Sequence, residues 1–192
     1  MLDRVMPSIL ETPAVREAAM PVTVDQYGRL TEEGIIPENT ELIRGVILKK
    51  VGKSPLHTWI VQSLVERLKA MLPDGVHVRQ EQPLTLRDSE PEPDLAVVSG
   101  EAFDYRRAHP RTAELVVEVA VSTEELDLEK AGIYSEAGIS EYWVIAPKQN
   151  AVTICSAPAE EGYQRRATIG IGDTLVSRRF PEIHISVASL FE

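Results

Sequence analysis

Two acids and one lysine stand out because they interrupt otherwise apolar segments. Glu118 lies inside the run 115–121, where a carboxylate is costly to desolvate unless it is paired with a cation, bound to a metal or protonated. Asp94 opens another strand-like run, and Lys130 lies on the apolar stripe of the segment after Glu118. Two converging carboxylates beside a lysine suit phosphodiester hydrolysis through Mg²⁺ or Mn²⁺, hard cations that prefer oxygen ligands. Asp94 and Glu118 are thus candidate metal ligands, and Lys130 is a candidate for orienting water or stabilising the transition state.

Each of these residues also has a purely structural interpretation. Glu118 could be a strand-end glutamate that reaches water, and Asp94 could be a turn former. Lys130 could pack its aliphatic stem while its amine reaches the edge of the helix. An inward-facing acid followed, on the next element, by an inward-facing lysine favours one shared site over two independent exceptions.

The surrounding pattern predicts an α/β fold with a mixed central sheet flanked by helices. Ser54 and Pro55 are typical of a helix start, and apolar spacing carries that helix to about Leu72. Three strands are expected over 76–86, 94–98 and 115–121, then a helix over 122–138 with Ser122 and Glu125 at capping-box spacing, then a strand over 141–146. The expected order of these elements is α-β-β-β-α-β. Further strands are expected over 152–156, 163–169 and 174–177.

The N-terminal part is expected to comprise an arm and two short elements. Residues 1–21 lack a sustained period and are interpreted as an arm or loose first helix. A short helix is expected from Thr23, and a hairpin over 40–50 turns at Arg44-Gly45. Residues 22–192 are interpreted as a single domain, because the chain of 192 residues suits one core better than two.

Composition narrows the classes of protein. No apolar run approaches the roughly 18 residues needed to span a bilayer, and the first 20 residues do not resemble a secretory signal, so a cytoplasmic protein without a membrane partner is expected. The net charge of −10 argues against a surface that binds nucleic acid all over. Local basic clusters remain, although either could simply be a solvated face: Lys49, Lys50 and Lys53, and Arg106, Arg107 and Arg111. The single cysteine, Cys155, is interpreted as a core residue.

Several segments together resemble a large bacterial family assigned as restriction endonucleases, first defined as a domain of unknown function, within the PD-(D/E)xK nuclease superfamily. The resemblance runs from about Val22 to the C-terminus, and the ending Gly-Ile-x-Glu-Tyr-Trp at 138–143 is specific. The similar segments are residues 41–45, His57, residues 93–98, residues 115–119 and residues 130–145.

This resemblance implies a restriction-endonuclease-like core that hydrolyses DNA, with a divalent metal between Asp94 and Glu118. It also implies that Glu41 is a further ligand or an acid that supports the ligands. One position departs from the superfamily pattern, in which a lysine stands two residues after the strand glutamate, because this chain has Ala120 there. The family shows the same absence, and its helix lysine matches Lys130, which is proposed to reach the site from across the groove.

Other polar residues carry less weight. His57 lies on an apolar helix face, where a histidine is more often a hydrogen-bonded core residue than a ligand. The resemblance makes it a stronger candidate for an additional site residue. Gln80 and Gln82 would share a strand face and touch the site or substrate, whereas Trp59 and Trp143 are interpreted as core aromatics.

Alternatives to DNA cleavage remain open. The chain could be a catalytically inactive nuclease-fold module for binding or assembly, or could hydrolyse another phosphoester. Paired acids also serve glycosidases, but a glycosidase offers no role for an inward Lys130. A homodimer is plausible because cleavage of both strands by a small one-site enzyme needs two active sites.

Overall fold

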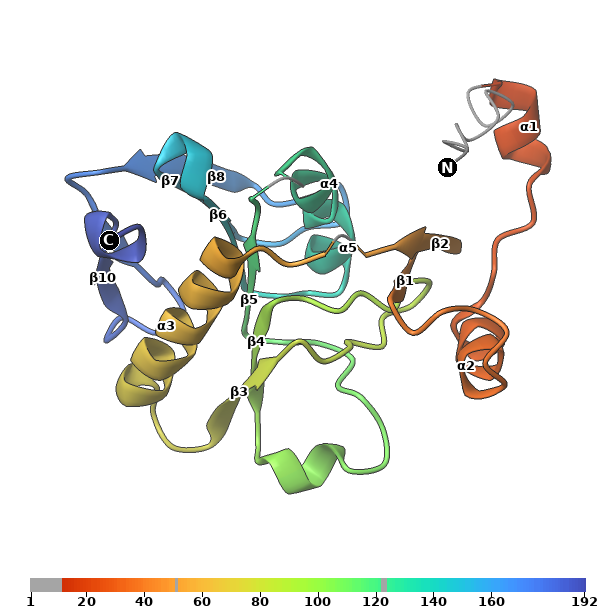
Figure 1. Cartoon of the computed structure of the whole chain (residues 1–192), viewed down its shortest axis with the longest axis horizontal. Helices are drawn as coiled ribbons and strands as arrows, with labels where there is room; N and C mark the ends of the chain where they lie inside the picture. Colours follow the sequence, from red (N-terminus) through yellow and green to blue (C-terminus); the bar gives the residue numbers. More distant parts are fainter. Residues whose placement is uncertain (1–11, 51, 122–123) are drawn as a thin grey trace.

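The core of the molecule is a six-stranded mixed sheet in the order β3-β4-β5-β6-β7-β8 (Figure 1). The computed structural model describes residues 12–50, 52–121 and 124–192. All neighbouring strands are antiparallel except β5 and β6, which are parallel because the chain crosses over between them through two short helices. The strands are β3 (Val76–Gln80), β4 (Leu95–Ser99), β5 (Leu115–Val119), β6 (Glu141–Ala146), β7 (Ala151–Ser156) and β8 (Arg165–Gly170).

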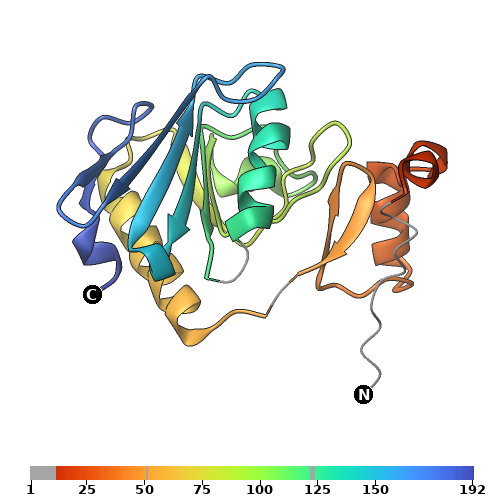
Figure 2. The ribbon, with the colours of Figure 1, turned by 90° about the horizontal axis from the view of Figure 1, so that it is seen from above.

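Helices cover both faces of this sheet (Figure 2). On one face lies α3 (Pro55–Met71), whose Ser54 side chain accepts a hydrogen bond from the His57 amide and whose first residue is proline, as the sequence predicted. The other face is covered by α4 (Glu124–Glu129) and α5 (Ala131–Glu136). The strands β4 to β6 are therefore almost wholly buried, which explains why their sequences are nearly continuous apolar runs.

The alternation of side chains divides the core into two clusters. Leu95, Val117 and Trp143 face α3, together with the inward stripe of that helix. Ala96, Val116 and Tyr142 face the opposite way, against Ile133 and Tyr134 of α5. Asp94 and Glu118 belong to the same alternation as Ala96 and Val116, so both acids lie on the α5 side of the sheet.

The C-terminal segment completes the α3 face. A two-stranded sheet of β9 (Thr174–Val176) and β10 (His184–Ser186) precedes the short helix η4 (Ala188–Leu190). Leu175, Ile185 and Leu190 are buried in the cluster under α3. Two further short helices, η2 (Ala102–Tyr105) and η3 (Pro147–Gln149), connect strands at the surface.

The N-terminal elements lie beside the main sheet. They are α1 (Pro13–Ala18), α2 (Val24–Glu32) and the hairpin of β1 (Thr40–Ile43) with β2 (Val46–Lys49). Thr23 caps α2 with a complete capping box to Gln26. Arg44 and Gly45 both have positive φ, at 48° and 76°, as a two-residue type I′ turn requires. Through Leu42, β1 pairs with Glu90, and this bridge ties the hairpin to the main domain.

The predicted mixed sheet and element order are confirmed, but three details of the prediction are wrong. The strand expected over 76–86 ends at Gln80, because Glu81 adopts a positive φ of 51° that breaks the ladder. The helix expected over 122–138 is divided at Lys130 into α4 and α5, while its Ser122 cap lies outside the described residues. Trp59 is 41% exposed, whereas Trp143 is fully buried as expected.

None of the described helices has both the length and the apolar character needed to cross a membrane.

The packing of α3 can be tested by comparing a substitution on its buried face with one on its exposed face. We expect Leu64→Ala to lower the free energy of unfolding by about 2–5 kcal/mol, because it opens a cavity at a fully buried position. Trp59→Ala, on the same helix but half exposed, should cost less than half as much. Urea unfolding followed by circular dichroism measures both, and equal losses would contradict this packing.

Candidate active site

Asp94 and Glu118 lie side by side at the ends of two paired strands. Leu95 is the partner of Val117 in the antiparallel ladder, so the next pair along it is Asp94 opposite Glu118. The Asp94 amide donates to Glu118 Oε2 at 3.2 Å, and the Val119 amide donates to Asp94 Oδ2 at 2.7 Å. Each carboxylate is thus fixed by the backbone of the neighbouring strand, which brings two acids separated by 24 residues to one point.

The second Glu118 oxygen faces the helices. Lys130 Nζ lies 3.2 Å from Glu118 Oε1, and the Tyr134 hydroxyl donates to the same oxygen at 3.1 Å. Lys130 and Tyr134 are four residues apart and therefore share one helical face. Lys130 points inward, as expected, and only 5% of the residue is exposed.

Lys130 is surrounded by carboxylates from three different elements. Besides Glu118, its ammonium lies 3.0 Å from Glu41 Oε1 on β1 and 3.7 Å from Asp127 Oδ1 on α4. Glu41 in turn accepts a hydrogen bond from the Glu92 amide at 3.4 Å. The hairpin therefore completes the site, because it contributes the acid closest to the lysine.

On its other side, Asp94 contacts a histidine and a lysine. His57 Nε2 lies 3.0 Å from Asp94 Oδ2, and Lys53 Nζ lies 3.8 Å from Asp94 Oδ1. Because a carboxylate only accepts, His57 donates through Nε2. Its Nδ1 is buried without a hydrogen-bond partner among the described residues. His57 is thus a positioning group for Asp94 at the start of α3.

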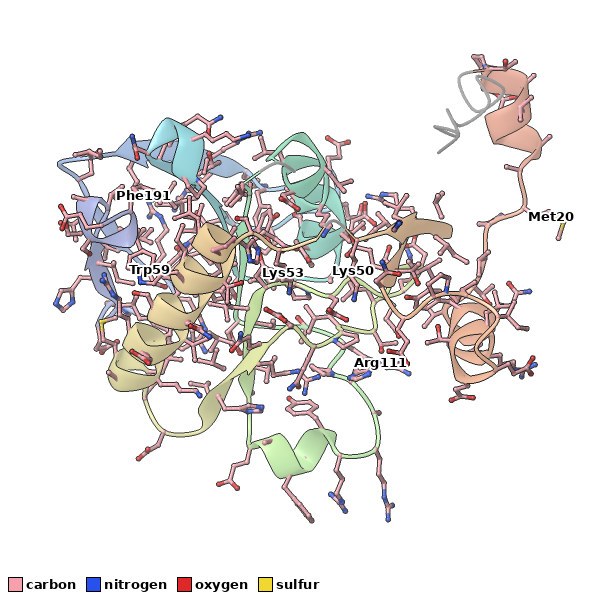
Figure 3. The ribbon with its side chains drawn as sticks, viewed as in Figure 1. Met20, Lys50, Lys53, Trp59, Arg111 and Phe191 are labelled. Atoms are coloured by element: carbon pink, nitrogen blue, oxygen red, sulfur yellow. The ribbon has the colours of Figure 1, made fainter. Side chains whose placement is uncertain are left out.

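These side chains line one pocket of about 110 Å³. Figure 3 shows Lys50 and Lys53, which both line the pocket, between the central sheet and the N-terminal hairpin. Lys50 pairs with Glu92 and Lys53 with Glu81, each at 2.8 Å. The residues that line the pocket are Glu41, Lys49, Lys50, Gly52, Lys53, Ser54, His57, Glu92, Asp94, Glu118, Val119, Val121, Leu126, Asp127 and Lys130.

Comparison with known proteins agrees with this arrangement. Residues 24–188 match the model of the Uma2 family, described as "Putative restriction endonuclease". The chain belongs to the Uma2 family. The resemblance inferred from the sequence is thereby confirmed.

The fold is shared with a solved structure of a distant protein. A crystal structure of a putative nuclease belonging to DUF820, from Anabaena variabilis, superposes with a TM-score of 0.73 at 18% identity, covering 89% of this chain and 98% of that one. None of the curated proteins matches this chain. Uma2 membership and the nuclease-like fold together support a nuclease.

Burial and mutual repulsion dominate the electrostatics of this Uma2 site. Burial, together with the charges of Asp94, Asp127 and Glu41, raises the pKa of Glu118 to about 8 despite the opposing effect of Lys130. Burial disfavours the Lys130 ammonium, but the surrounding carboxylates outweigh that penalty and raise its pKa above the usual value. Burial also raises the pKa of Tyr134, so its hydroxyl stays protonated and donates to Glu118.

The donor set fits a hard divalent cation. Four carboxylates, from Glu41, Asp94, Glu118 and Asp127, are buried around one buried ammonium, so negative charge is in excess there. Within the described part of the chain, no group of three or more His, Cys, Asp or Glu side chains could hold a metal ion by itself. Mg²⁺ does not require such a cage, because one or two carboxylates with water and substrate phosphate commonly bind it.

The sequence predicted the residues at the centre of this pocket but not all of their partners. Asp127, which lines the pocket, and Tyr134, whose hydroxyl donates to Glu118, were not predicted as site residues, although both lie at helical spacing from Lys130, three residues before it and four after. Ala120 is buried among apolar residues on the α5 side, on the same face as Glu118. Gln82 lies beyond the end of β3, so it shares no strand face with Gln80, and neither glutamine lines the pocket.

The raised pKa of Glu118 predicts a specific pH dependence for the metal-free protein. An acid whose pKa rises from 4.5 to about 8 on folding stabilises the fold below pH 4.5 and loses that contribution as pH rises through 8. Between pH 6 and 9 the wild type should therefore lose about 2–3 kcal/mol more of its unfolding free energy than Glu118→Gln.

Urea denaturation in the presence of a chelator measures this difference. Glu182→Gln, which changes an exposed glutamate, serves as the control and should follow the wild type. Parallel pH profiles for wild type and Glu118→Gln would show that burial does not hold the proton on Glu118.

Proposed function

We propose that this Uma2 protein is a metal-dependent endonuclease that hydrolyses phosphodiester bonds in DNA. The observation that carries the proposal is the position of Lys130 Nζ, 3.2 Å from Glu118 Oε1, while the other Glu118 oxygen accepts from the Asp94 amide. A structural glutamate that reached water would need neither partner. This arrangement of two acids and one cation suits the charge changes of phosphodiester hydrolysis.

In this proposal Asp94 and Glu118 hold Mg²⁺ or Mn²⁺ through their carboxylate oxygens. Such an ion lowers the pKa of water and neutralises charge on a phosphate. His57 keeps Asp94 in place through the hydrogen bond from Nε2, and the Val119 amide fixes the same oxygen. Glu41, which contacts Lys130, supports the arrangement from the hairpin.

Lys130 is proposed to orient the attacking water or to stabilise the more negative transition state. Its charge is kept in place by Glu41 and Asp127, so displacement of the amine would break its ion pairs with both carboxylates. The strand position that usually holds this lysine is occupied by the uncharged Ala120. Lys130 reaches Glu118 from the helix side instead. A fixed positive charge in a water-poor site contributes more than one in solvent.

DNA is the proposed substrate because the family description names restriction endonucleases and because Lys49, Lys50 and Lys53 line the pocket. One such site cuts one strand, so cleavage of both strands requires two copies of the chain. We therefore propose a homodimer during double-strand cleavage.

The first test removes the proposed metal ligands. Asp94→Ala and Glu118→Ala should each reduce nicking of supercoiled DNA in Mn²⁺ or Mg²⁺ by more than about 10³-fold, since metal assistance is worth several kcal/mol. Agarose-gel nicking assays measure the rates, and circular dichroism verifies the fold of each variant.

Matched controls are available on the surface. Asp74→Ala and Glu182→Ala remove exposed acids of the same types and should leave nicking unchanged. Undiminished cleavage by Asp94→Ala or Glu118→Ala would exclude the assigned roles. Wild-type protein that binds DNA but does not cleave it, whichever divalent ion is added, would favour the inactive binding module.

A rescue experiment tests Lys130. Lys130→Met should lower the nicking rate by about 10²–10³-fold, the cost of losing one transition-state-stabilising group. Adding Ala120→Lys to this variant should recover part of the rate, because position 120 lies on the same strand face as Glu118. Lys130→Met that nicks at the wild-type rate would show that this amine takes no part in the chemistry.

A further inference from the structure

A second unusual cation lies on the edge strand β3. Arg79 is 6% exposed, and no carboxylate in the described part of the chain forms an ion pair with it. Its Nη2 donates to His109 Nδ1 at 3.1 Å and meets the Pro83 carbonyl at 3.5 Å, while its Nε is buried without a hydrogen-bond partner among the described residues. A buried guanidinium with a free N–H is costly unless an anion completes its contacts.

No described carboxylate compensates the charge of Arg79, which only an aromatic ring offsets in part. Burial lowers the pKa of Arg79, and the nearby aromatic group is Tyr105, whose ring centroid lies 5.4 Å from the guanidinium carbon. Because His109 accepts the hydrogen bond from Arg79 through Nδ1, the His109 proton lies on Nε2. His109 is exposed, so Nε2 can donate to a ligand at the surface.

The loop of residues 105–111, which contacts Arg79 through His109, carries further uncompensated positive charge. Residues 105–111 contain Arg106, Arg107 and Arg111 and no acid, although the whole chain has a net charge of −10. All three arginines are exposed, and none forms an ion pair with a described carboxylate. Arg106 instead lies over the Phe103 ring at 3.9 Å. In an acidic protein, such a loop is a localised attraction for phosphate.

Arg79, which this loop contacts through His109, lies near the proposed catalytic pair on the sheet. Arg79 is the ladder partner of Ala96, which lies two residues from Asp94 on β4. The Arg79–Ala96 pair is therefore separated from Asp94 by about 7 Å along the strand direction. Duplex DNA rises about 3.4 Å per nucleotide of one strand, so this spacing corresponds to about two nucleotides. In the view of Figure 3, Arg111 lies between the sheet and α2, below Lys50 and Lys53.

We propose that Arg79, His109 and Arg111 bind a backbone phosphate of the DNA substrate about two nucleotides from the cleaved bond, and that Arg106 and Arg107 extend this contact along the flanking duplex. The inference rests on the proposed function for the identity of the ligand as DNA. The phosphate contacts the guanidinium of Arg79 and accepts a hydrogen bond from His109 Nε2. The site positions the substrate and takes no part in breaking the bond.

Equilibrium binding separates this proposal from a structural role for the arginines. A fluorescently labelled 20-base-pair DNA duplex is titrated with the full chain in a chelator, at salt concentrations from 50 to 200 mM, and affinity is taken from anisotropy. We expect Arg111→Gln to reduce the slope of log affinity against log salt by about 0.9, the value for one phosphate contact, and Arg106→Gln/Arg107→Gln/Arg111→Gln to reduce it further.

The opposite edge of the sheet supplies the matched control. Arg165→Gln/Arg166→Gln removes two exposed arginines from β8 and should leave the slope unchanged. Arg79→Met should weaken binding as well, and if that buried variant fails to fold, the exposed variants still decide the outcome. A slope that is unchanged in Arg111→Gln and in the triple variant overturns the proposal, as does a change seen only with an RNA duplex of equal length.

Parallel nicking assays keep this inference distinct from the proposed activity. If wild-type protein nicks DNA but the arginine variants keep the wild-type slope, the phosphate site is wrong and the nuclease stands. If no divalent ion supports nicking but the slope falls as expected, the phosphate site stands and the hydrolytic function is wrong. Absence of DNA binding by the wild type would overturn the phosphate site.

Discussion

The contact between the Lys130 ammonium and its ring of buried carboxylates is the constraint on which the site depends. Glu41 comes from the hairpin, Glu118 from the sheet and Asp127 from the crossover helices, and the lysine holds all three within 3.7 Å. Removal of one member of a buried ion cluster leaves an uncompensated charge that costs about 3–5 kcal/mol. The cluster thereby couples the N-terminal hairpin and α4 to the central sheet.

Such a cluster is a poor way to stabilise a domain, because apolar residues of similar size do so without a desolvation penalty. The raised pKa of Glu118 expresses that penalty: in the absence of further positive charge, this carboxylate is held in its protonated form well above its usual range. Groups with strongly perturbed pKa values concentrate at functional sites. The same excess of negative charge that destabilises the metal-free pocket is what makes it suited to a divalent cation.

The net charge of the chain conceals two different local environments. The pocket between the sheet and α4 combines five carboxylates with four lysines, whereas residues 105–111 and Arg79 carry positive charge that no described carboxylate neutralises. A phosphodiester substrate needs both, because the reacting phosphate binds through a cation and the neighbouring phosphates bind to arginine. Composition averages over these regions, and only their separate positions on the sheet make the acidic total compatible with a nucleic-acid ligand.

The sequence by itself determined the order of elements and the three central residues, because strand and helix periods are local and Glu118 and Lys130 visibly break them. It did not determine where β3 ends, that Trp59 of α3 is 41% exposed, that Asp127 lines the pocket or that Tyr134 donates to Glu118. Those features depend on the register between β4 and β5 and on the docking of the hairpin, which join residues far apart in the chain. Hydrogen-bond distances of about 3 Å between such residues follow from packing in three dimensions, and no local pattern encodes them.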